Sequence, residues 1–308
     1  MIAVVFPGQG SQAPGMGEDL YHNDSFARQV FDQVSNATGV NVSDLCFHAD
    51  AETLRETQNA QLALYTCGLA AWYALHEMTG LKPAAMAGHS VGEYAALAAA
   101  GVLSVEAGAK LVQKRGDLMS RAGAMRPGGM AAVLGLERDE LESALKDISE
   151  SGVAVIANDN CPGQLVISGD MDAIHKATAV LPEKGAKRVL PLNVSGAFHS
   201  PLMEDSAQAM GEHLRNAKFN AGDVKVYSNV TTEPGDNWPD LLEKQLMSPV
   251  RWTESIQNMR RDGINKFIEC GSGEVLSGLL RRIDKEATSM KVVDTATLAE
   301  VAEQVKGN

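Results

Sequence analysis

Residues 88–92 read GHSVG, a G-x-S-x-G pattern that constrains the fold more than any other part of the chain. The apolar stretch KPAAMAG before it predicts a strand, and the Ala-rich GEYAALAAAG after it predicts a helix. A sharp turn between a strand and a helix exposes a serine hydroxyl, and glycine on both sides avoids a clash across the turn. The pattern therefore favours an α/β fold with Ser90 as a nucleophile over a serine that only caps the helix.

A serine nucleophile needs a base, and His199 is the best-placed histidine of the chain. The stretch VLPLNVSGAF predicts a strand that ends at His199, and Ser200-Pro201 predict the N-cap and first residue of a helix. Such a junction is rigid yet exposed, although a partly buried loop histidine is the alternative. His175 and His213 are interpreted as surface residues of helices. His89 is interpreted as structural, because the strand directs it away from the hydroxyl.

Arg115 stands in an otherwise apolar stripe of a predicted helix, between Leu111 and Leu118. A buried, unpaired guanidinium is costly, and its planar fork binds a carboxylate through two hydrogen bonds. The partner is either an internal Asp or Glu, or the carboxylate of a substrate.

The order of predicted elements divides the chain into two parts. Strands and helices alternate over most of it, which predicts a hydrolase-like parallel sheet covered by helices. Residues 125–193 read instead as βαββαβ, the pattern of a ferredoxin-like subdomain. We therefore expect an α/β fold with a large domain formed by residues 1–124 and 194–308, into which a small subdomain of residues 125–193 is inserted.

Charge and cysteine usage exclude several classes of protein. A net charge of −12 argues against a sequence-independent grip on nucleic acid. The four cysteines form no CxxC pair, so no metal site or redox motif is indicated, and reduced thiols predict a cytoplasmic protein. The N-terminus lacks the pattern of a signal peptide, and no apolar run approaches the ~18 residues of a membrane span.

Two other functions fit parts of the sequence. A serine esterase would use Ser90, but its catalytic histidine comes near the end of the chain after an Asp or Glu. Here 109 residues follow His199, and no Asp is singled out by position. A dinucleotide site would use GQGSQA in the first loop, FPGQGSQ, but the following segment predicts a helix instead of a second strand, and no GK[ST] follows.

Six motifs in order resemble the malonyl-CoA:acyl carrier protein transacylases, a family whose pattern the acyltransferase domains of polyketide and fatty acid synthases share. The resemblance covers essentially the whole chain. The motifs are FPGQGSQ at the start, GHSVGEY around Ser90, QKRG around Arg115, NDNCPGQLVISG at 158–169, SGAFHSPLM around His199 and QLMSPVRW around Gln245.

The resemblance implies a role for each matching position. Ser90 takes the acyl group, His199 acts as base and then acid, and the main-chain carbonyl of Gln245 holds the histidine ring. The backbone N–H groups of Gln9 and Val91 form the oxyanion hole.

The resemblance also implies which residues bind the substrate. Arg115 pairs with the malonyl carboxylate, Gln61 lies near the site, and Phe198 just before the histidine favours malonyl over larger acyl groups. Asn160, in the NDNCPGQLVISG motif, completes the set.

The implied reaction moves malonyl from malonyl-CoA to the phosphopantetheine thiol of acyl carrier protein, through a malonyl-Ser90 ester. It needs no metal and no cofactor beyond these substrates, and a monomer is expected. Acyl carrier proteins are acidic, so a local basic patch is expected, although short charge clusters are more often solvated surface. The candidates for that patch are Lys187, Arg188, Arg281 and Arg282. A polyketide or malonate decarboxylase carrier would use the same residues.

Overall fold

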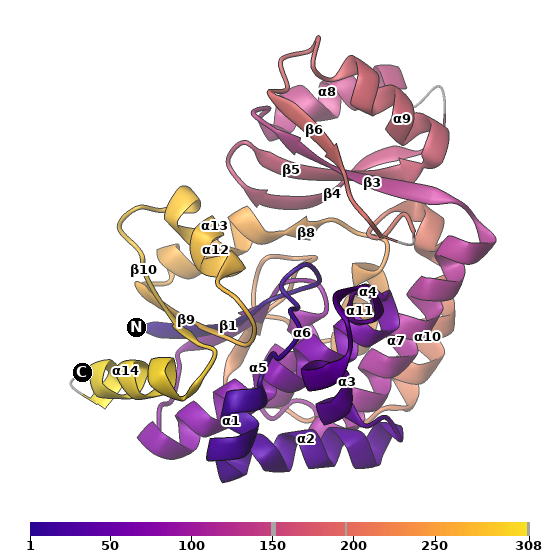
Figure 1. Cartoon of the computed structure of the whole chain (residues 1–308). Helices are drawn as coiled ribbons and strands as arrows, with labels where there is room; N and C mark the ends of the chain where they lie inside the picture. The colour runs from indigo at the N-terminus through magenta and orange to yellow at the C-terminus, as the bar shows by residue number, and fades with distance from the viewer. Residues whose placement is uncertain (149–151, 195, 307–308) are drawn as a thin grey trace.

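The computed structural model describes residues 1–148, 152–194 and 196–306. Ser195, the first residue of the SGAFHSPLM motif, lies outside the described residues. Two five-stranded sheets organise the molecule, one in the larger body and one in the smaller lobe above it (Figure 1). No helix in the described ranges has the length and apolar character needed to cross a membrane.

The first sheet is parallel throughout, in the order β10-β9-β1-β2-β7. Alternate residues of β1 serve opposite faces: Val4 and Phe6 join one hydrophobic core, whereas Ala3 and Val5 join another. Burial on both faces explains why this strand is continuously apolar. The strands are β1 (Ile2–Phe6), β2 (Ala85–Gly88), β7 (Lys225–Tyr227), β9 (Lys266–Cys270) and β10 (Thr288–Val292).

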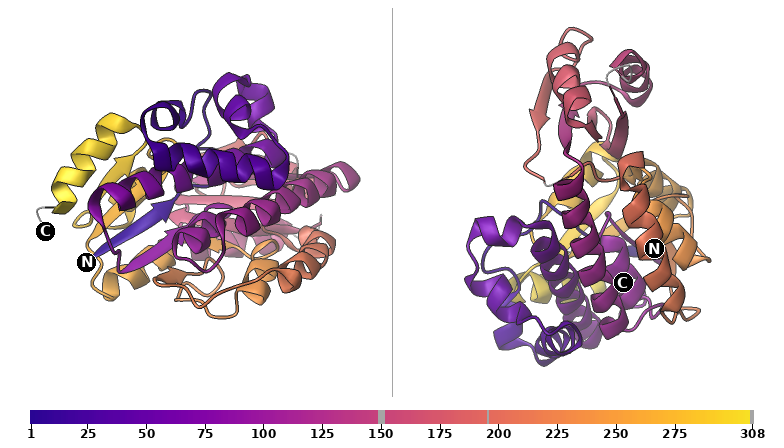
Figure 2. Two further views of the ribbon diagram at one scale, coloured as in Figure 1. Left: turned by 90° about the horizontal axis from the view of Figure 1, so that it is seen from below. Right: turned by 90° about the vertical axis from the view of Figure 1, so that its right-hand side faces the viewer.

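Helices cover both faces of this sheet (Figure 2). Those on one side include α1 (Glu18–Asn23), α2 (Ser25–Thr38), α3 (Val42–His48), α4 (Ala51–Arg55), α5 (Thr57–Thr79), α6 (Gly92–Ala99), α7 (Val105–Met125), α10 (Glu204–Asn216), α11 (Trp238–Gln245) and α14 (Thr295–Lys306). On the other side lie α12 (Trp252–Arg261) and α13 (Val275–Ile283). A parallel sheet covered by helices confirms the predicted α/β fold.

The second sheet contains the predicted βαββαβ segment. Its strands lie in the order β6-β3-β5-β4-β8, and the first four pair antiparallel. Two helices cover one face and enclose a separate small core. The elements are β3 (Gly128–Leu134), α8 (Arg138–Ile148), β4 (Ala154–Cys161), β5 (Gln164–Asp170), α9 (Met171–Val180) and β6 (Arg188–Pro191).

The fifth strand of this sheet comes from outside that segment. β8 (Val250–Arg251) pairs in parallel with β4, at Asn158↔Val250 and Asp159↔Arg251. It lies between α11 and α12, so the body of the molecule contributes the edge strand of the smaller lobe. Because β8 follows Gln245 by only a few residues, this pairing links the second sheet to the segment that contacts His199.

Candidate active site

Ser90 lies at a tight turn between β2 and α6. Its φ of 52° is left-handed, which is uncommon for a residue other than glycine. Gly92 packs so closely against β1 that a Cβ there would lie 2.2 Å from the carbonyl oxygen of Phe6. This close approach explains the second glycine of the motif, and the turn presents the Ser90 hydroxyl to the interior of a cavity.

His199 contacts the serine directly. Its Nε2 lies 2.8 Å from Ser90 Oγ, and its Nδ1 lies 2.8 Å from the main-chain oxygen of Gln245. A carbonyl only accepts hydrogen bonds, so Nδ1 carries the proton and Nε2 is free to accept one from the serine. Burial, followed by the nearby positive charge of Arg115, lowers the pKa of His199 to about 3. The imidazole is therefore neutral near pH 7, as a general base must be.

The position of His199 differs from the predicted strand end. β6 ends at Pro191, so His199 lies in the loop that follows, with a left-handed φ of 57°. Two hydrogen bonds to residues 245 and 246 hold it, one from its ring and one from its main-chain N–H to the Leu246 oxygen. The predicted N-cap is present, because Ser200 Oγ accepts from the Leu202 N–H at the start of η2 (Pro201–Met203).

Two backbone N–H groups near Ser90 have no acceptor among the described residues, those of Gln9 and Val91. β1 and β2 are neighbours and pair Phe6 with Gly88, so the loops after their carboxyl ends meet. Gly8 lets them meet closely, since a Cβ there would lie 2.5 Å from the His89 oxygen. The two N–H groups are thus available for an oxyanion.

Arg115 lies fully buried beneath the serine. Its Nη2 donates to Ser90 Oγ at 3.1 Å and to Gln245 Oε1 at 3.0 Å, and its Nη1 donates to Gln61 Oε1 at 2.6 Å. It forms no salt bridge with any described Asp or Glu, and its Nε has no hydrogen-bond partner. The internal ion pair considered from the sequence is therefore not formed in the described part of the chain.

Glu93, in the first turn of α6, is a buried carboxylate that sequence reasoning missed. Its Oε2 accepts a hydrogen bond from Gln245 Nε2 at 2.6 Å. The same Nε2 also donates to the main-chain oxygen of Ser90 at 3.0 Å. Burial raises the pKa of Glu93 to about 7, against the opposing effects of Gln245 and Arg115. Its place in GHSVGEY was a possible signal, since an acid in an apolar Ala-rich helix is out of pattern.

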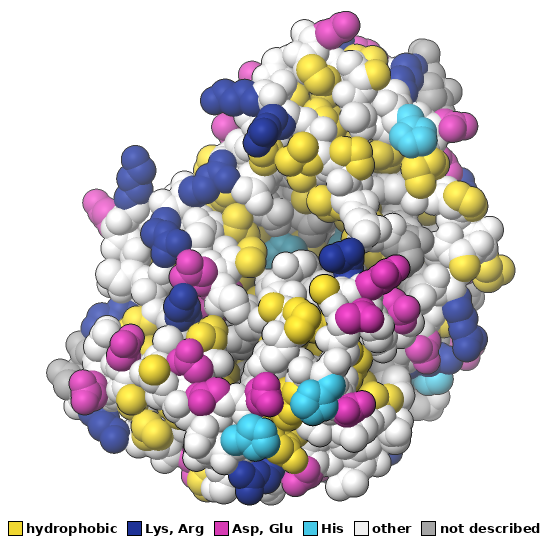
Figure 3. Space-filling model, in the orientation of Figure 1, with side chains coloured by type: hydrophobic (Ala, Val, Ile, Leu, Met, Phe, Trp, Pro, Cys, Tyr) yellow, Lys and Arg dark blue, Asp and Glu magenta, His cyan; other side chains and the backbone are white. Residues whose placement is uncertain are grey.

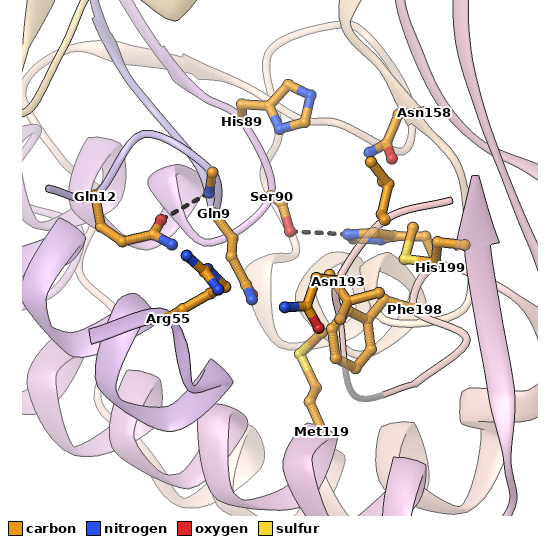
Figure 4. A pocket seen from close by; sticks show the side chains of 14 residues that line it. Gln9, Gln12, Arg55, His89, Ser90, Met119, Asn158, Asn193, Phe198 and His199 are labelled. Atoms are coloured by element: carbon orange, nitrogen blue, oxygen red, sulfur yellow. Dashed lines mark hydrogen bonds between the residues drawn. The ribbon is translucent and has the colours of Figure 1, made fainter. Parts of the chain in front are cut away.

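A cavity of about 460 Å³ opens above Ser90 and His199. Figure 3 shows a hollow between the lobe with the second sheet and the body below it. Figure 4 shows the Ser90 and His199 side chains facing each other in this cavity, with Gln9 and Arg55 on one side and Phe198 on the other.

The remaining predicted residues divide into lining and supporting positions. Phe198 lines the cavity, whereas Gln61 lies buried behind it against Arg115. Asn160 is not among the lining residues; its Oδ1 lies 2.8 Å from His89 Nε2 instead. Sequence reasoning assigned no role to several lining residues. Gln12 and Asn158 lie within motifs quoted from the sequence, FPGQGSQ and NDNCPGQLVISG, whereas the others lie in none: Arg55, Met119, Met130, Leu192, Asn193 and Val194. The described residues contain no cluster of three or more His, Cys, Asp or Glu side chains able to hold a metal ion.

Known proteins match this chain over nearly its full length. The family model described as "Acyl transferase domain" matches residues 3–301. The malonyl CoA-acyl carrier protein transacylase of Bacillus subtilis (strain 168) is 42% identical over 301 residues, which are 96% of this chain and 95% of that protein.

Solved structures match equally well. A crystal structure of malonyl-CoA:acyl carrier protein transacylase (FabD) from Xanthomonas oryzae pv. oryzae superposes with a TM-score of 0.95 at 40% identity, covering 98% of both chains. A malonyl-transacylase solved in complex with its type II PKS acyl-carrier protein gives a TM-score of 0.94 at 35% identity, covering 98% of this chain and 99% of that one. With these matches and the Ser90–His199 geometry, the chain belongs to the acyl transferase domain family, among relatives that are malonyl-CoA:acyl carrier protein transacylases.

Proposed function

We propose that this protein is an acyltransferase that moves malonyl from malonyl-CoA to the phosphopantetheine thiol of acyl carrier protein, through a malonyl-Ser90 intermediate. The observation that carries the proposal is the position of Arg115. A buried guanidinium lies 3.1 Å from the nucleophile and has no salt bridge among the described residues. A carboxylate attached two bonds beyond the ester carbonyl would supply that partner.

In the first half-reaction, His199 Nε2 takes the Ser90 proton as Oγ attacks the thioester carbonyl. The N–H groups of Gln9 and Val91 donate to the developing oxyanion. The tetrahedral intermediate collapses as the C–S bond breaks, and the imidazolium returns its proton to the CoA sulfur. A malonyl ester on Ser90 remains.

The second half-reaction runs the same steps with the carrier. The phosphopantetheine thiol gives its proton to His199, and the sulfur attacks the ester carbonyl. The C–Oγ bond then breaks, and the imidazolium reprotonates Ser90. The main-chain oxygen of Gln245 fixes the His199 ring in the tautomer that both half-reactions require.

Arg115→Ala is expected to slow malonyl loading by roughly 10²-fold or more. The variant loses the two charge-assisted hydrogen bonds from the guanidinium to the malonyl carboxylate, which are worth ~1.5–3 kcal/mol each. Intact mass spectrometry after incubation with malonyl-CoA, acetyl-CoA and methylmalonyl-CoA measures the loading. The wild type should form the malonyl adduct, and the variant should lose its preference for malonyl over acetyl. Residual acetyl loading by the variant shows that the site is still folded.

Arg115→Lys is the matched control, since it keeps the charge but not the planar fork. We expect intermediate malonyl loading from it. Equal loading of the wild type with malonyl-CoA and acetyl-CoA would contradict the role of Arg115.

The predicted basic patch consists of Lys187, Arg188, Arg281 and Arg282, and we propose it as the docking site of the acidic carrier. Two of its members lie near the same turn although they are distant in sequence. Arg282 donates to Gln164 at the β4–β5 turn, and Lys187 packs against Gly135, whose N–H donates to Gly163 of that turn. All four side chains are exposed and form no salt bridge among the described residues. Lys and Arg side chains gather on this face of Figure 3.

Reversal of charge at Lys187 and Arg282 together should raise KM for the carrier by about tenfold, since two exposed ion pairs are worth up to ~1 kcal/mol each. KM for malonyl-CoA should stay constant. Lys110→Glu with Lys306→Glu, which makes the same change in net charge on α7 and α14, is the control. If both KM values rise together, or if the control acts equally, the patch is not the docking site.

Two alternatives concern the acceptor. A polyketide carrier is favoured by the structural match to a type II PKS malonyl-transacylase, and the site serves that chemistry equally. Loading assays with different carriers separate the two. A simple esterase is disfavoured, since a neutral ester leaves Arg115 without its partner.

All four cysteines are buried free thiols, which fits the expected cytoplasmic setting.

A further inference from the structure

The loop after β7 brings an asparagine beneath the nucleophile turn. Asn229 is 1% exposed; its Oδ1 accepts from the Ser90 N–H at 2.8 Å, and its Nδ2 donates to the Gly88 oxygen at 2.7 Å. We propose that Asn229 is a positioning residue that holds the turn in its left-handed conformation and occupies the Ser90 N–H. The oxyanion is then served by the Val91 N–H next in the chain. This role rests on the proposed acyl transfer.

The two hydrogen bonds require an amide. The Ser90 N–H needs an acceptor and the Gly88 oxygen needs a donor, and one planar amide offers both. Serine is too short to reach both groups, and an ionised aspartate can only accept. The polarity of the two partners also fixes the orientation of the Asn229 side chain.

The Asn229 main chain is itself fixed. Its N–H donates to Glu93 Oε2 at 3.3 Å, and its oxygen accepts from the Arg251 N–H at 3.4 Å. Glu93 also contacts Gln245, so the same carboxylate holds the segments behind the serine and behind the histidine.

Thr232 shows how tightly this loop is held. Among the described residues other than glycine, only Ser90, His199 and Thr232 have a positive φ. Thr232 is β-branched, for which φ of 64° is a genuine outlier. Asn258 stabilises it by donating to both its main-chain oxygen and its Oγ1, at 3.0 and 2.9 Å. A left-handed residue thus shapes the loop that supports the left-handed nucleophile.

Asn229→Ala tests the proposal. The saturating rate of Ser90 acylation by malonyl-CoA, measured in a single turnover, should fall by about 10²-fold, because a small misplacement of a reacting group costs that much. The half-saturating malonyl-CoA concentration should change little, since Arg115 keeps its other contacts to Gln61 and Gln245. Labelling of Ser90 by a fluorophosphonate, which needs no malonyl group, should slow in parallel.

Asn229→Asp supplies a readout that a merely structural role would not move. A protonated Asp regains the donor to Gly88, so the rate of this variant relative to wild type should rise as pH falls. The charged and titratable groups near residue 229 are Glu93, Arg251 and, through Gln245, Arg115 and His199. Arg251, Arg115 and His199 are present in both proteins and act on both. The carboxylate introduced by Asn229→Asp and that of Glu93 would share Gln245 Nε2, so the ratio reports the titration of this pair. The ratio for Asn229→Ala should stay flat.

Asn258→Ala is the matched control, because it removes buried hydrogen bonds from the same loop but none from the turn. It should lower the melting temperature and change acylation by at most about threefold, since Glu93 and Arg251 still hold Asn229. Acylation of Asn229→Ala within threefold of wild type, or a flat ratio for Asn229→Asp, would overturn the inference. Absence of a malonyl adduct on wild type, with fluorophosphonate labelling intact, would instead contradict the proposed function.

Discussion

Ser90→Ala is expected to abolish the malonyl adduct and to lower malonyl transfer by on the order of 10⁴-fold or more, the scale of nucleophile removal in serine hydrolases. The reason is that, among the described residues, only the Ser90 hydroxyl makes a hydrogen bond with His199 Nε2, at 2.8 Å. Arg115 and the N–H groups of Gln9 and Val91 would still bind malonyl-CoA. The variant should therefore retain substrate binding while it loses the acylation step. The measurement is intact mass after malonyl-CoA addition, together with the rate of carrier loading.

A matched control is Ser168→Ala in the second sheet. Ser168 is also buried, and its hydroxyl has no hydrogen-bond partner in the described structure. The control should keep the adduct and nearly all of the transfer rate. An adduct that persists in Ser90→Ala would place the covalent step on another residue.

His199→Ala is expected to slow acylation by roughly 10³-fold, within the range that positioned general bases contribute. Its effect on stability has a defined sign. The folded-state pKa is about 3 against an ordinary value of 6.5, so between these values the unfolded chain binds a proton that the folded chain does not. Folding stability is therefore lost as pH falls below about 6.5, and the variant should lose less of it than the wild type.

Urea unfolding of both proteins at pH 7.5 and pH 5 measures this difference. His89, whose pKa burial also lowers, and Glu93, whose raised pKa acts in the opposite direction, are common to both proteins. Their contributions therefore largely cancel in the comparison, apart from the charge repulsion between His89 and His199, which also lowers the His199 pKa. A steeper pH dependence in His199→Ala than in wild type would contradict the buried neutral imidazole.

Much of the site follows from local sequence. The turn at Ser90 could be predicted because a strand, two glycines and a helix are all encoded within a short stretch. The approach of the loop after β1 to the turn after β2, seen between Gly8 and His89, follows once these strands are neighbours in a parallel sheet, and it places Gln9 and Val91 in these two segments. Their roles, like those of Gln245 and Arg115, came from the resemblance and stay predictions.

Other features depend on contacts that no local pattern encodes. Asn229 lies 139 residues from Ser90 in a loop without a motif, and its hydrogen bonds exist only in the folded chain. His199 was expected at a strand end because VLPLNVSGAF is apolar, yet pairing with β3 stops at Pro191. The turn of Asn160 toward His89 likewise depends on how β4 lies across the body, which periodicity does not reveal.

The pairing of β8 with β4 has a consequence for protein engineering. Exchange of the smaller lobe between relatives, to alter which carrier is accepted, would naturally cut the chain on either side of β3–β6. Such a graft would leave the recipient's Val250–Arg251 to pair with a foreign β4 edge, a few residues from the carbonyl that orients His199. A functional chimera should therefore take residues 246–251 from the donor of the lobe as well. This second exchanged segment lies far from the lobe in sequence, so it would be missed if only the sequence boundaries of the lobe were considered.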